Sequence, residues 1–378
     1  MLPRVAHLIP EYLGHTLNWV YTQIKFTAGY EHYVLTGNTV NLDDYPIVHI
    51  FTPRFRTSAS GYWERFFRRL GLLPPNYYLT YVSLLRKFHP FVINAHFGWE
   101  GFFALSLRKK LGIPLITRFY GYDVGILPRS ERWRRRYKRL FMEGDLFLVE
   151  GNNMKSAIES LGCAQDKIVI HRLGVDLDQI SFIPRIPRKH EFTVLMAASF
   201  KEKKGLEYGL IAMRRVIDAL PDKRINIRII GDGVLRDRLY HLADVLNLHP
   251  YIQWHGYQPH SVFLQALYEV DVFLSPSVTA SNGDTEGGAP VALIEAQAAG
   301  LPVVSTFHAD IPEVVLNNRT GLLVPERDAV KLAEAIIALV QNPELRLRFG
   351  REGRRHIELN YNAVEQGRRL SEIYSYFK

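Results

Sequence analysis

Short apolar runs alternate along the chain with longer stretches in which apolar residues recur every three or four positions. The short runs are rich in Val, Ile, Leu and Phe, as is typical of strands buried on both faces, and the longer stretches have the spacing of amphipathic helices. The strands that this pattern predicts cover residues 5–9, 32–36, 47–51, 91–97, 114–119, 146–150, 167–173, 193–198, 225–230, 251–254, 271–276, 302–306 and 321–324. The predicted helices cover residues 17–28, 101–111, 131–141, 152–160, 205–220, 234–246, 290–299 and 329–339, and the tail from 343 to 378 also looks helical.

Strands separated by helices predict an α/β protein whose parallel sheets carry helices on both faces. A chain of 378 residues can bury two cores of ordinary size, so we expect two doubly wound, Rossmann-like domains facing each other across a cleft. Pro184 and Pro187 lie among basic residues in a stretch without apolar periodicity, which is typical of a linker. The expected division is therefore a first domain at 1–180, a linker at 181–190, a second domain at 191–360 and a C-terminal helix at 361–378 that crosses back to the first domain.

The overall composition is that of a globular protein, with 47% hydrophobic and 22% charged residues. The single cysteine, Cys163, excludes an internal disulfide framework and fits a reducing compartment. No apolar run approaches the ~20 residues that cross a bilayer, and the N-terminus leads directly into a strand rather than a signal peptide. We therefore expect a cytoplasmic protein, either free or peripheral on the inner face of the membrane.

Positive charge is concentrated in the first half of the chain. Residues 1–180 hold 23 Lys and Arg against 15 Asp and Glu, whereas residues 181–378 hold 24 against 23. Two basic stretches with interleaved aromatic residues, from Arg54 to Arg69 and from Arg129 to Arg139, contribute much of this excess. Each suits either an anionic membrane surface or a solvated face of the domain itself. No nucleic-acid reading motif accompanies them, so we expect no nucleic-acid partner.

The stretch from 284 to 306 reads as loop, helix, turn and strand. Pro290 suits the first helical position, because its missing N–H would be unpaired there anyway, and Gly300 suits the helix end. Glu286 lies in the loop and Glu295 in the helix. Two carboxylates beside free backbone amides suit a ligand rich in hydroxyl groups, whereas a carboxylate repels a phosphate. The alternative is that Glu286 is an ordinary helix-start acid and Glu295 a solvated helix residue.

The backbone amides belong to Gly287, Gly288 and Ala289, where the lack of bulky side chains lets a ligand approach the helix N-terminus closely. Elsewhere in this half, Gly231 and Gly233 follow the strand at 225–230 and form half of a dinucleotide fingerprint, since the third glycine is absent. They are consistent with a tight turn beside a nucleotide.

Lysines and histidines give further indications of chemistry. Lys201, Lys203 and Lys204 follow the strand at 193–198, where a diphosphate would need cations, although a solvated charge run is the alternative. The 14 histidines show no zinc-binding spacing, so we expect no metal site.

Polar residues also end two strands of the first half. His96 closes the strand at 91–97, and Tyr120 and Asp123 follow the strand at 114–119. Because the carboxyl ends of parallel strands meet at one edge of a sheet, we expect these three side chains to line one ligand site.

Together these motifs resemble the retaining glycosyltransferases of the GT-B fold, in the large family-4 (group 1) division. The resemblance covers nearly the whole chain and is looser in the first half. It rests on Lys203-Lys204-Gly205, Ile230-Gly-Asp-Gly233, Trp254-His-Gly256, residues 271–277, Glu286-Gly-Gly-Ala-Pro290, Glu295, residues 299–304, Ala95-His-Phe-Gly98 and Phe119-Tyr-Gly-Tyr-Asp123.

The resemblance implies that the second domain holds a nucleotide diphosphate sugar and the first domain holds the acceptor. Glu295 would bind the ribose, Lys204 the diphosphate, and Glu286 with the neighbouring amides the donor sugar. No metal or other cofactor is implied, because cationic side chains and a helix dipole stabilise the leaving diphosphate. The implied catalytic residues are Glu286, Lys204 and His96; donor binding adds Ser199, Gly231, Gly233, Gly287, Gly288, Ala289, Pro290 and Glu295; and the acceptor side comprises Gly14, His96, Tyr120 and Asp123.

Four positions depart from the family pattern. Eight residues separate Glu286 from Glu295 where the family usually has seven, so the loop must bulge by one residue. Ser199 stands where the family has a phosphate-binding arginine, and Lys201 is a candidate replacement. Tyr120 stands where a histidine is common, and Gly14 is a single glycine where relatives often have two.

We therefore expect a retaining, metal-independent hexosyltransferase that acts on a saccharide or lipid-linked acceptor in the synthesis of a cell-surface or extracellular polysaccharide. The substitutions at Ser199 and Tyr120 leave open a catalytically degenerate protein of the same fold that binds a saccharide or a membrane. A sugar-nucleotide epimerase of the same fold is a third hypothesis.

Overall fold

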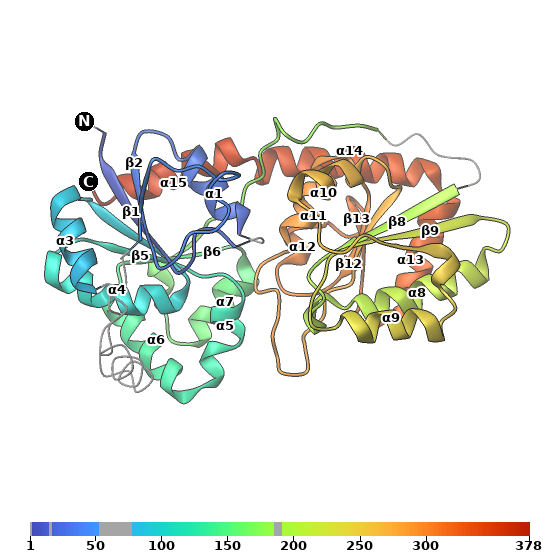
Figure 1. Ribbon diagram of the computed structural model, residues 1–378, viewed down its shortest axis with the longest axis horizontal. Helices are drawn as coiled ribbons and strands as arrows, with labels where there is room; N and C mark the ends of the chain where they lie inside the picture. Colours follow the sequence, from blue (N-terminus) through green and yellow to red (C-terminus); the bar gives the residue numbers. More distant parts are fainter. Residues whose placement is uncertain (1, 15–16, 53–77, 185–190) are drawn as a thin grey trace. The chain divides into compact units, whose positions relative to one another are not determined.

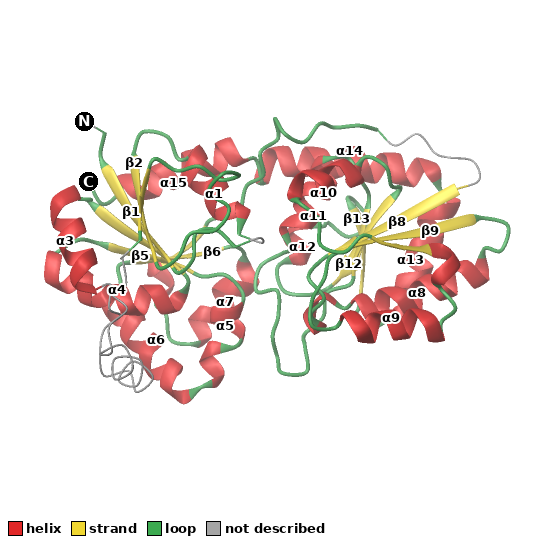
Figure 2. Ribbon diagram, in the orientation of Figure 1, coloured by secondary structure: helices red, strands yellow, loops and turns green. Residues whose placement is uncertain are grey.

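The computed structural model describes residues 2–14, 17–52, 78–184 and 191–378. These residues form two compact units, one within residues 1–174 together with 363–378, and the other at 175–362. In each unit helices lie on both sides of a parallel sheet (Figure 1 and Figure 2). The expected α/β class and the two doubly wound sheets are confirmed.

The first unit holds a seven-stranded sheet in the order β3-β2-β1-β4-β5-β6-β7, with every neighbouring pair parallel. Its strands are β1 (Arg4–Ile9), β2 (Glu31–Thr36), β3 (His49–Phe51), β4 (Val92–His96), β5 (Leu115–Arg118), β6 (Leu146–Val149) and β7 (Ile168–Ile170). Its helices are α1 (Asn18–Phe26), α3 (Tyr78–Phe88), α4 (Gly98–Leu111), α5 (Tyr122–Gly125), α6 (Glu131–Glu143), α7 (Asn152–Ser160) and α15 (Ala363–Ser375), with short turns η1 (Leu127–Arg129) and η2 (Gln165–Lys167).

The second unit holds a six-stranded sheet in the order β10-β9-β8-β11-β12-β13, again with parallel neighbours. Its strands are β8 (Glu191–Ala197), β9 (Arg224–Ile230), β10 (Ile252–Trp254), β11 (Val272–Ser275), β12 (Val303–Thr306) and β13 (Gly321–Val324). Its helices are α8 (Leu206–Ala219), α9 (Arg236–Val245), α10 (His260–Leu267), α11 (Val291–Ala298), α12 (Ile311–Val314), α13 (Ala329–Gln341) and α14 (Pro343–Asn360), with short turns η3 (Glu202–Lys204) and η4 (His249–Tyr251).

Both central strands are buried on both faces, which explains why most of their residues are apolar. In β8, Val194 and Met196 pack into the core on one face of the sheet and Leu195 into the core on the other. In β1, Ala6 and Val5 divide in the same way. Because successive side chains of a strand point to opposite faces, a parallel sheet covered on both sides needs an apolar residue at nearly every position.

The observed division of the chain differs from the expected boundaries at both crossings. Residues 175–180, expected in the first domain, belong to the second unit. Val175 donates its N–H to the carbonyl of Tyr361 at 2.8 Å, and Ile180 packs in the second unit's core. The expected linker was placed by its prolines. A proline restricts the backbone, but it does not mark the residue at which the chain leaves one hydrophobic core and enters the other. Part of that linker, residues 185–190, lies outside the described residues.

The last helix, α15, belongs to the first unit although it follows the second in the chain. Its Leu370 and Tyr374 pack with Val5 and Val92 of the central strands. The hydroxyl of Tyr374 accepts a hydrogen bond from the side chain of Asn94 at 2.7 Å.

The helix after the Glu286 loop begins one residue later than expected. Pro290 is the residue before the first helical position, with ψ 128°, and α11 starts at Val291. Gly300 ends the helix in a left-handed conformation, φ 78°, as the sequence predicts. Among the described residues, the sequence pattern missed the α-helices α3, α5, α10 and α12, of which α3 has 11 residues and the others are shorter. None of the helices described is long and apolar enough to cross a membrane.

Candidate functional site

Glu286 lies in the loop between β11 and α11, and its side chain is almost completely buried, at 6% exposure. Its carboxylate lies 2.8 Å from the ammonium of Lys204 and accepts a hydrogen bond from the hydroxyl of Ser277, also at 2.8 Å. Burial disfavours ionisation, but the charges of Lys204 and Lys203 and these hydrogen bonds hold the pKa of Glu286 below its ordinary value. The site therefore contains a buried, ionised carboxylate.

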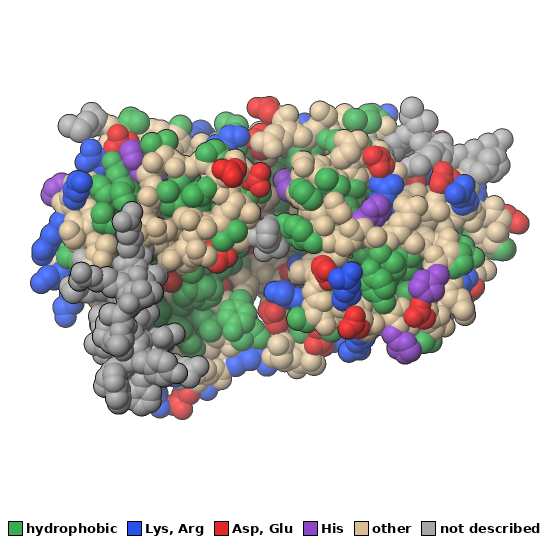
Figure 3. Space-filling model, viewed as in Figure 1, with side chains coloured by type: hydrophobic (Ala, Val, Ile, Leu, Met, Phe, Trp, Pro, Cys, Tyr) green, Lys and Arg blue, Asp and Glu red, His purple; other side chains and the backbone are tan. Residues whose placement is uncertain are grey.

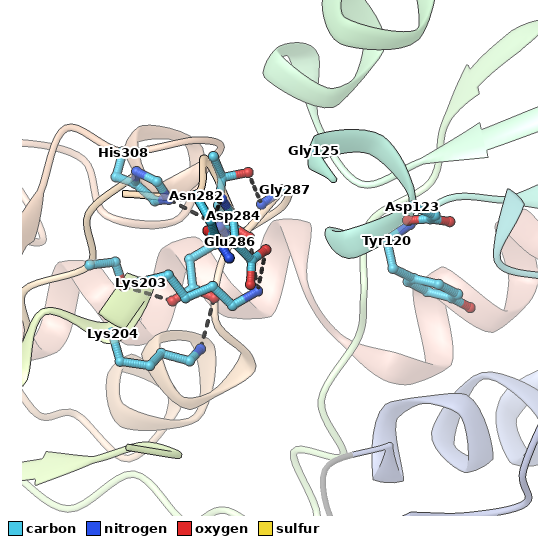
Figure 4. A network of polar contacts seen from close by, with 12 residues as sticks. Tyr120, Asp123, Gly125, Lys203, Lys204, Asn282, Asp284, Glu286, Gly287 and His308 are labelled. Atoms are coloured by element: carbon cyan, nitrogen blue, oxygen red, sulfur yellow. Dashed lines mark hydrogen bonds and ion pairs between the residues drawn. The ribbon is translucent and has the colours of Figure 1, made fainter. Parts of the chain in front are cut away.

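The two lysines come from the turn that follows β8. Lys203 donates to the carboxylate of Asp284 at 3.2 Å and to the carbonyl of Thr285 at 2.9 Å (Figure 4). Gly205 makes this approach possible, because it has φ 62° and a Cβ there would lie 1.9 Å from the carbonyl oxygen of Pro276. The turn after β8 thus packs directly against the chain after β11, and this contact brings both lysines to the Glu286 loop.

The glycines after Glu286 shape the start of α11. Gly287 has φ 77°, a conformation that favours glycine, and its N–H donates to the hydroxyl of Thr285 at 3.2 Å. Gly287 and Gly288 are buried, Ala289 and Pro290 are half-buried, and the residue before the helix supplies no side-chain cap. Because that residue does not cap the helix, the first N–H groups can donate hydrogen bonds to the oxygens of a ligand.

Glu295 lies in the middle of α11 and forms a separate pair with His260 at the start of α10. The side chain of Glu295 is 7% exposed, and its carboxylate is 2.7 Å from Nε2 of His260. Burial alone would lower the pKa of His260, but the hydrogen bond and charge of Glu295 raise it above the ordinary value. His260 is a site residue that the sequence pattern did not reveal, since nothing in its neighbourhood along the chain marks it.

The other expected donor residues lie in a tightly packed turn. A Cβ on Gly231 would lie 1.9 Å from the carbonyl oxygen of Ala198, and one on Gly233 would lie 2.9 Å from the backbone of Phe200. These glycines let the turn after β9 lie against the chain after β8, so packing alone accounts for them. Ser199 is half-buried in the same turn and brings no charge, while Lys201 is exposed nearby.

In the first unit, His96 is fully buried and belongs to a chain of hydrogen-bonded rings. Its Nδ1 lies 2.6 Å from the Tyr120 hydroxyl and its Nε2 3.2 Å from Nδ1 of His7. Nε2 of His7 lies 2.9 Å from Nδ1 of His32, whose Nε2 faces the carbonyl of Thr27 at 2.9 Å. A carbonyl can only accept, so Nε2 of His32 donates to Thr27 and its Nδ1 accepts from His7. In the same way, His7 accepts from His96. Tyr120 therefore donates its proton inward to His96.

The structure shows what surrounds His96, while its expected role toward a substrate stays a prediction. Both of its ring nitrogens are used inside the unit, and burial, assisted by the charge of Arg118, lowers its pKa to about 3. His96 is thus buried and hydrogen-bonded at both ring nitrogens, and its contact on one side is the Tyr120 hydroxyl.

Asp123 holds the start of α4 against the chain after β5. It is fully buried and accepts hydrogen bonds from the N–H groups of Gly98 at 2.8 Å and Tyr120 at 3.0 Å. Burial raises its pKa to about 6 against the opposing effect of those N–H groups. His96, Tyr120 and Asp123 therefore lie together, as expected, but Asp123 is occupied in positioning the backbone.

Two further buried groups of this unit escaped the sequence analysis. Arg118, at the end of β5, is fully buried and donates to the carbonyl of His171 at 2.6 Å. Glu100, in the first turn of α4, is buried, and burial raises its pKa to about 7. Gly14, expected on the acceptor side, is half-buried next to residues 15 and 16, which lie outside the described residues.

Comparison with known proteins places this site in a family context. The model of the family described as "Glycosyl transferases group 1" matches residues 178–356, and that of "Glycosyltransferase Family 4" matches residues 27–179. WcaL of Escherichia coli, named for glycosyl transfer in colanic acid biosynthesis, is 33% identical over 327 residues, covering 83% of this chain and 80% of the relative. AmsK of Erwinia amylovora, named an amylovoran biosynthesis glycosyltransferase, is 33% identical over 284 residues, covering 75% and 69%.

A solved structure with a bound nucleotide sugar has the same fold. Anabaena Alr3699/HepE in complex with UDP-glucose matches with a TM-score of 0.76 at 14% identity, covering 98% of this chain and 99% of that one.

Proposed function

The chain belongs to the group 1 glycosyltransferases of the GT-B fold, and from that premise we propose that it transfers a hexose from a nucleotide diphosphate sugar, with retention of anomeric configuration. The donor would bind the second unit and the acceptor the first. The observation that carries this proposal is the buried pair of Glu286 and Lys204 beside the uncapped start of α11.

The donor roles follow from the chemistry of each group. Glu286 is ionised and can accept hydrogen bonds from sugar hydroxyls, while Lys204 beside it offers a cation to a diphosphate. Glu295, held at one oxygen by His260, keeps the other oxygen for the ribose hydroxyls. A bound UDP-glucose in a protein of the same fold supports a donor of this class.

The proposed reaction takes place on one face of the donor sugar. The bond between C1 and the diphosphate oxygen breaks as the acceptor hydroxyl forms a new C1–O bond on the same face. The proton of that hydroxyl passes to the leaving phosphate oxygen. Lys204 and the N-terminal amides of α11 would stabilise the charge that develops there, so no metal is required.

The names of the relatives support a role in making an exported polysaccharide. WcaL and AmsK are named for colanic acid and amylovoran biosynthesis. We assign this chain to the same kind of pathway, with a saccharide or lipid-linked acceptor.

A membrane surface is the proposed second partner, through α6. Tyr137, Leu140 and Phe141 of this helix are buried, and its basic residues Arg132, Arg134, Arg135, Lys138 and Arg139 are exposed. Figure 3 shows Lys and Arg side chains along the edge of the first unit near α3, a different part of that unit, and both signs of charge over the second unit. The other basic stretch, Arg54 to Arg69, lies outside the described residues.

Vesicle sedimentation tests the membrane partner. Each cation near an anionic surface contributes about 1 kcal/mol, so Arg134→Ala with Lys138→Ala should weaken binding to phosphatidylglycerol vesicles roughly 30-fold. Equal binding to anionic and to phosphatidylcholine vesicles would refute this partner.

Ser199 stands where the family has an arginine, and Tyr120 where it commonly has a histidine. These two differences favour one competing function, a degenerate protein that binds a saccharide without turnover. A sugar-nucleotide epimerase would differ from both, because it would convert its nucleotide sugar with no acceptor present.

A thermal-shift panel in EDTA tests the proposed donor. UDP, GDP and ADP are compared with their hexose conjugates, and a ligand at 100 times its Kd stabilises the folded state by about 2.7 kcal/mol. Glu295→Ala removes hydrogen bonds to a charged group, worth about 1.5–3 kcal/mol, and should weaken the active nucleotide roughly 10- to 100-fold. Silence across the panel at millimolar ligand would favour the degenerate protein, and unchanged affinity in Glu295→Ala would refute the assignment of Glu295.

A further inference from the structure

A histidine that follows β12 and a glutamate that follows β13, the next two strands of the sheet after β11, support the Glu286 loop. His308 comes shortly after β12 and is buried, and Glu326 comes shortly after β13. Nε2 of His308 lies 3.0 Å from the backbone nitrogen of Glu286, and its Nδ1 lies 2.7 Å from a carboxylate oxygen of Glu326. Figure 4 shows the His308 ring beside the Glu286 loop.

The chemistry of the partners fixes the proton on His308. A peptide N–H can only donate, so Nε2 of His308 must carry a lone pair. The ring proton is then on Nδ1 and is donated to Glu326. Burial disfavours the Glu326 anion, but hydrogen bonds from Thr279 and His308 hold the pKa of Glu326 below its ordinary value. By accepting the proton on Nδ1, the Glu326 carboxylate keeps Nε2 of His308 unprotonated and able to accept the N–H of Glu286.

Glu326 also holds the opposite end of the same loop. Its second oxygen accepts the N–H of Thr279 at 2.7 Å, and the side chain of Arg327 donates to the carbonyl of Thr279. One carboxylate therefore fixes the loop where it leaves β11, directly, and where it reaches Glu286, through His308. Between these ends, Glu202 accepts the N–H of Ser281 at 2.7 Å.

We propose that His308 and Glu326 are positioning residues for the donor site, which hold the backbone of Glu286 so that its carboxylate stays between Lys204 and Ser277. Neither residue touches the reacting atoms in this account; both act through Glu286. The inference rests on the proposed function for its consequence in catalysis. Without the bond from His308, the loop end is free to shift, and a shift at Glu286 displaces the group that would hold the donor sugar.

Two replacements of His308 separate a positioning role from a merely structural one. His308→Phe keeps a ring of similar size and removes both hydrogen bonds. His308→Gln offers an amide oxygen to Glu286 and an amide N–H to Glu326, so it can replace both bonds. We expect His308→Phe to raise the donor KM and lower kcat, with at least about a tenfold loss in kcat/KM for one lost hydrogen bond, and His308→Gln to recover most of that loss.

His356→Phe is the matched control. This histidine is in the same unit, and its Nε2 bonds to the backbone carbonyl of Glu313 at 2.9 Å, away from the Glu286 loop. It should keep the wild-type donor KM. A His308→Phe protein that folds and keeps wild-type kcat/KM would overturn the inference, as would a loss that appears only in kcat and is not recovered by His308→Gln.

Hydrogen exchange at the Glu286 amide separates this inference from the proposed function. His308→Phe should speed exchange of that amide at least about tenfold, and His356→Phe should not change it. If wild-type protein transfers no sugar but the amide responds in this way, the proposed function fails and the positioning role of His308 stands. If wild-type protein is active and the amide is indifferent to His308→Phe, the positioning role alone fails.

Discussion

Both units gather polar side chains at the carboxyl ends of parallel strands, but the second unit keeps a carboxylate ionised whereas the first keeps a chain of histidine and tyrosine rings neutral. In the second unit, Glu286 is an anion whose pKa is lowered by Lys204 and Lys203. In the first unit, burial lowers the pKa of His7, His32 and His96, which are therefore neutral, and raises that of Tyr120.

The difference matches the chemistry that we propose for each unit. An ionised pair can bind sugar hydroxyls and compensate the charge of a diphosphate in the same place. A neutral chain of rings fixes the direction of the buried Tyr120 hydroxyl without adding charge, and we propose that such a neutral environment suits a saccharide. The comparison leads to four predictions, in order of decreasing effect.

Acidification should destabilise the first unit before the second. A histidine whose pKa is lowered in the folded state takes up a proton on unfolding, so its stability is present above about pH 6.5 and is lost as the pH falls. Below about pH 6.5, each such histidine lowers the free energy of unfolding by up to about 1.36 kcal/mol per pH unit. The four histidines concerned are His7, His32, His96 and His171.

Two carboxyls in the first unit act in the opposite direction but are outnumbered. The raised pKa values of Asp123, about 6, and Glu100, about 7, mean that their stability is lost as the pH rises through those values. In the second unit, Glu286 and Glu326 have lowered pKa values and keep their stability until the pH falls below about 4.5. Calorimetry at pH 7.5, 6.5 and 5.5 should show one transition moving to lower temperature and one staying in place. Two transitions that move together would contradict the comparison.

Removing the charge of Glu286 should reduce catalysis more than any change in the first unit's histidine chain. Glu286→Gln keeps the shape of the side chain and leaves Lys204 without its anion. Loss of one group that holds the transition state costs about 10²- to 10³-fold in kcat. Steady-state kinetics with the donor found in the panel measures this. Glu344→Gln, on an exposed residue of α14, is the control and should leave the rate unchanged.

Asp123→Asn tests the neutral architecture of the first unit. The amide of asparagine can accept from only one of the two N–H groups that Asp123 now satisfies, those of Gly98 and Tyr120. The other N–H is buried without a partner, at a cost of about 1–3 kcal/mol in the free energy of unfolding. Urea unfolding monitors the change, and the exposed Asp166→Asn serves as the control. An Asp123→Asn protein as stable as wild type would show that these bonds contribute nothing.

An exposed ion pair should matter least. Arg135 and Glu131 on α6 are paired one helical turn apart, with side chains 75% and 67% exposed. Arg135→Ala should lower stability by only about 0.3–0.5 kcal/mol, measured by the same urea titration. A larger loss would indicate that α6 is held to its unit by charge and not by Tyr137, Leu140 and Phe141.

The sequence predicted the strands well because both sheets are covered on two faces, so most strand residues that face a core are apolar. It predicted short helices poorly: α10, from His260 to Leu267, contains too few turns to show a period. The contact between Lys204 and Glu286 was accessible only through resemblance to a family, because the two residues approach one another from different strand ends.

Other site residues could not be inferred from the sequence, for the same physical reason. His260, His308 and Glu326 reach the proposed donor site only when the strand ends come together in the fold, and no spacing along the chain marks them. His96 was expected to line a site because it ends a strand, and the resemblance implied a catalytic role; in the structure it is buried and bonded to His7 and Tyr120. A position at the end of a strand therefore predicts which residues lie near the site. Which of those side chains can reach a ligand depends on their burial, which the sequence does not show.

The central claim is that the second unit alone holds the nucleotide sugar, through Glu286 and Glu295. Isothermal titration of the donor into wild-type protein, Glu286→Gln, Glu295→Gln and Tyr120→Phe, each in EDTA, tests it most directly. We predict about a tenfold or greater loss of affinity in both glutamate variants, from the loss of hydrogen bonds to charged groups, and wild-type affinity in Tyr120→Phe. Wild-type affinity in both glutamate variants, or a loss in Tyr120→Phe as large as theirs, would contradict the account.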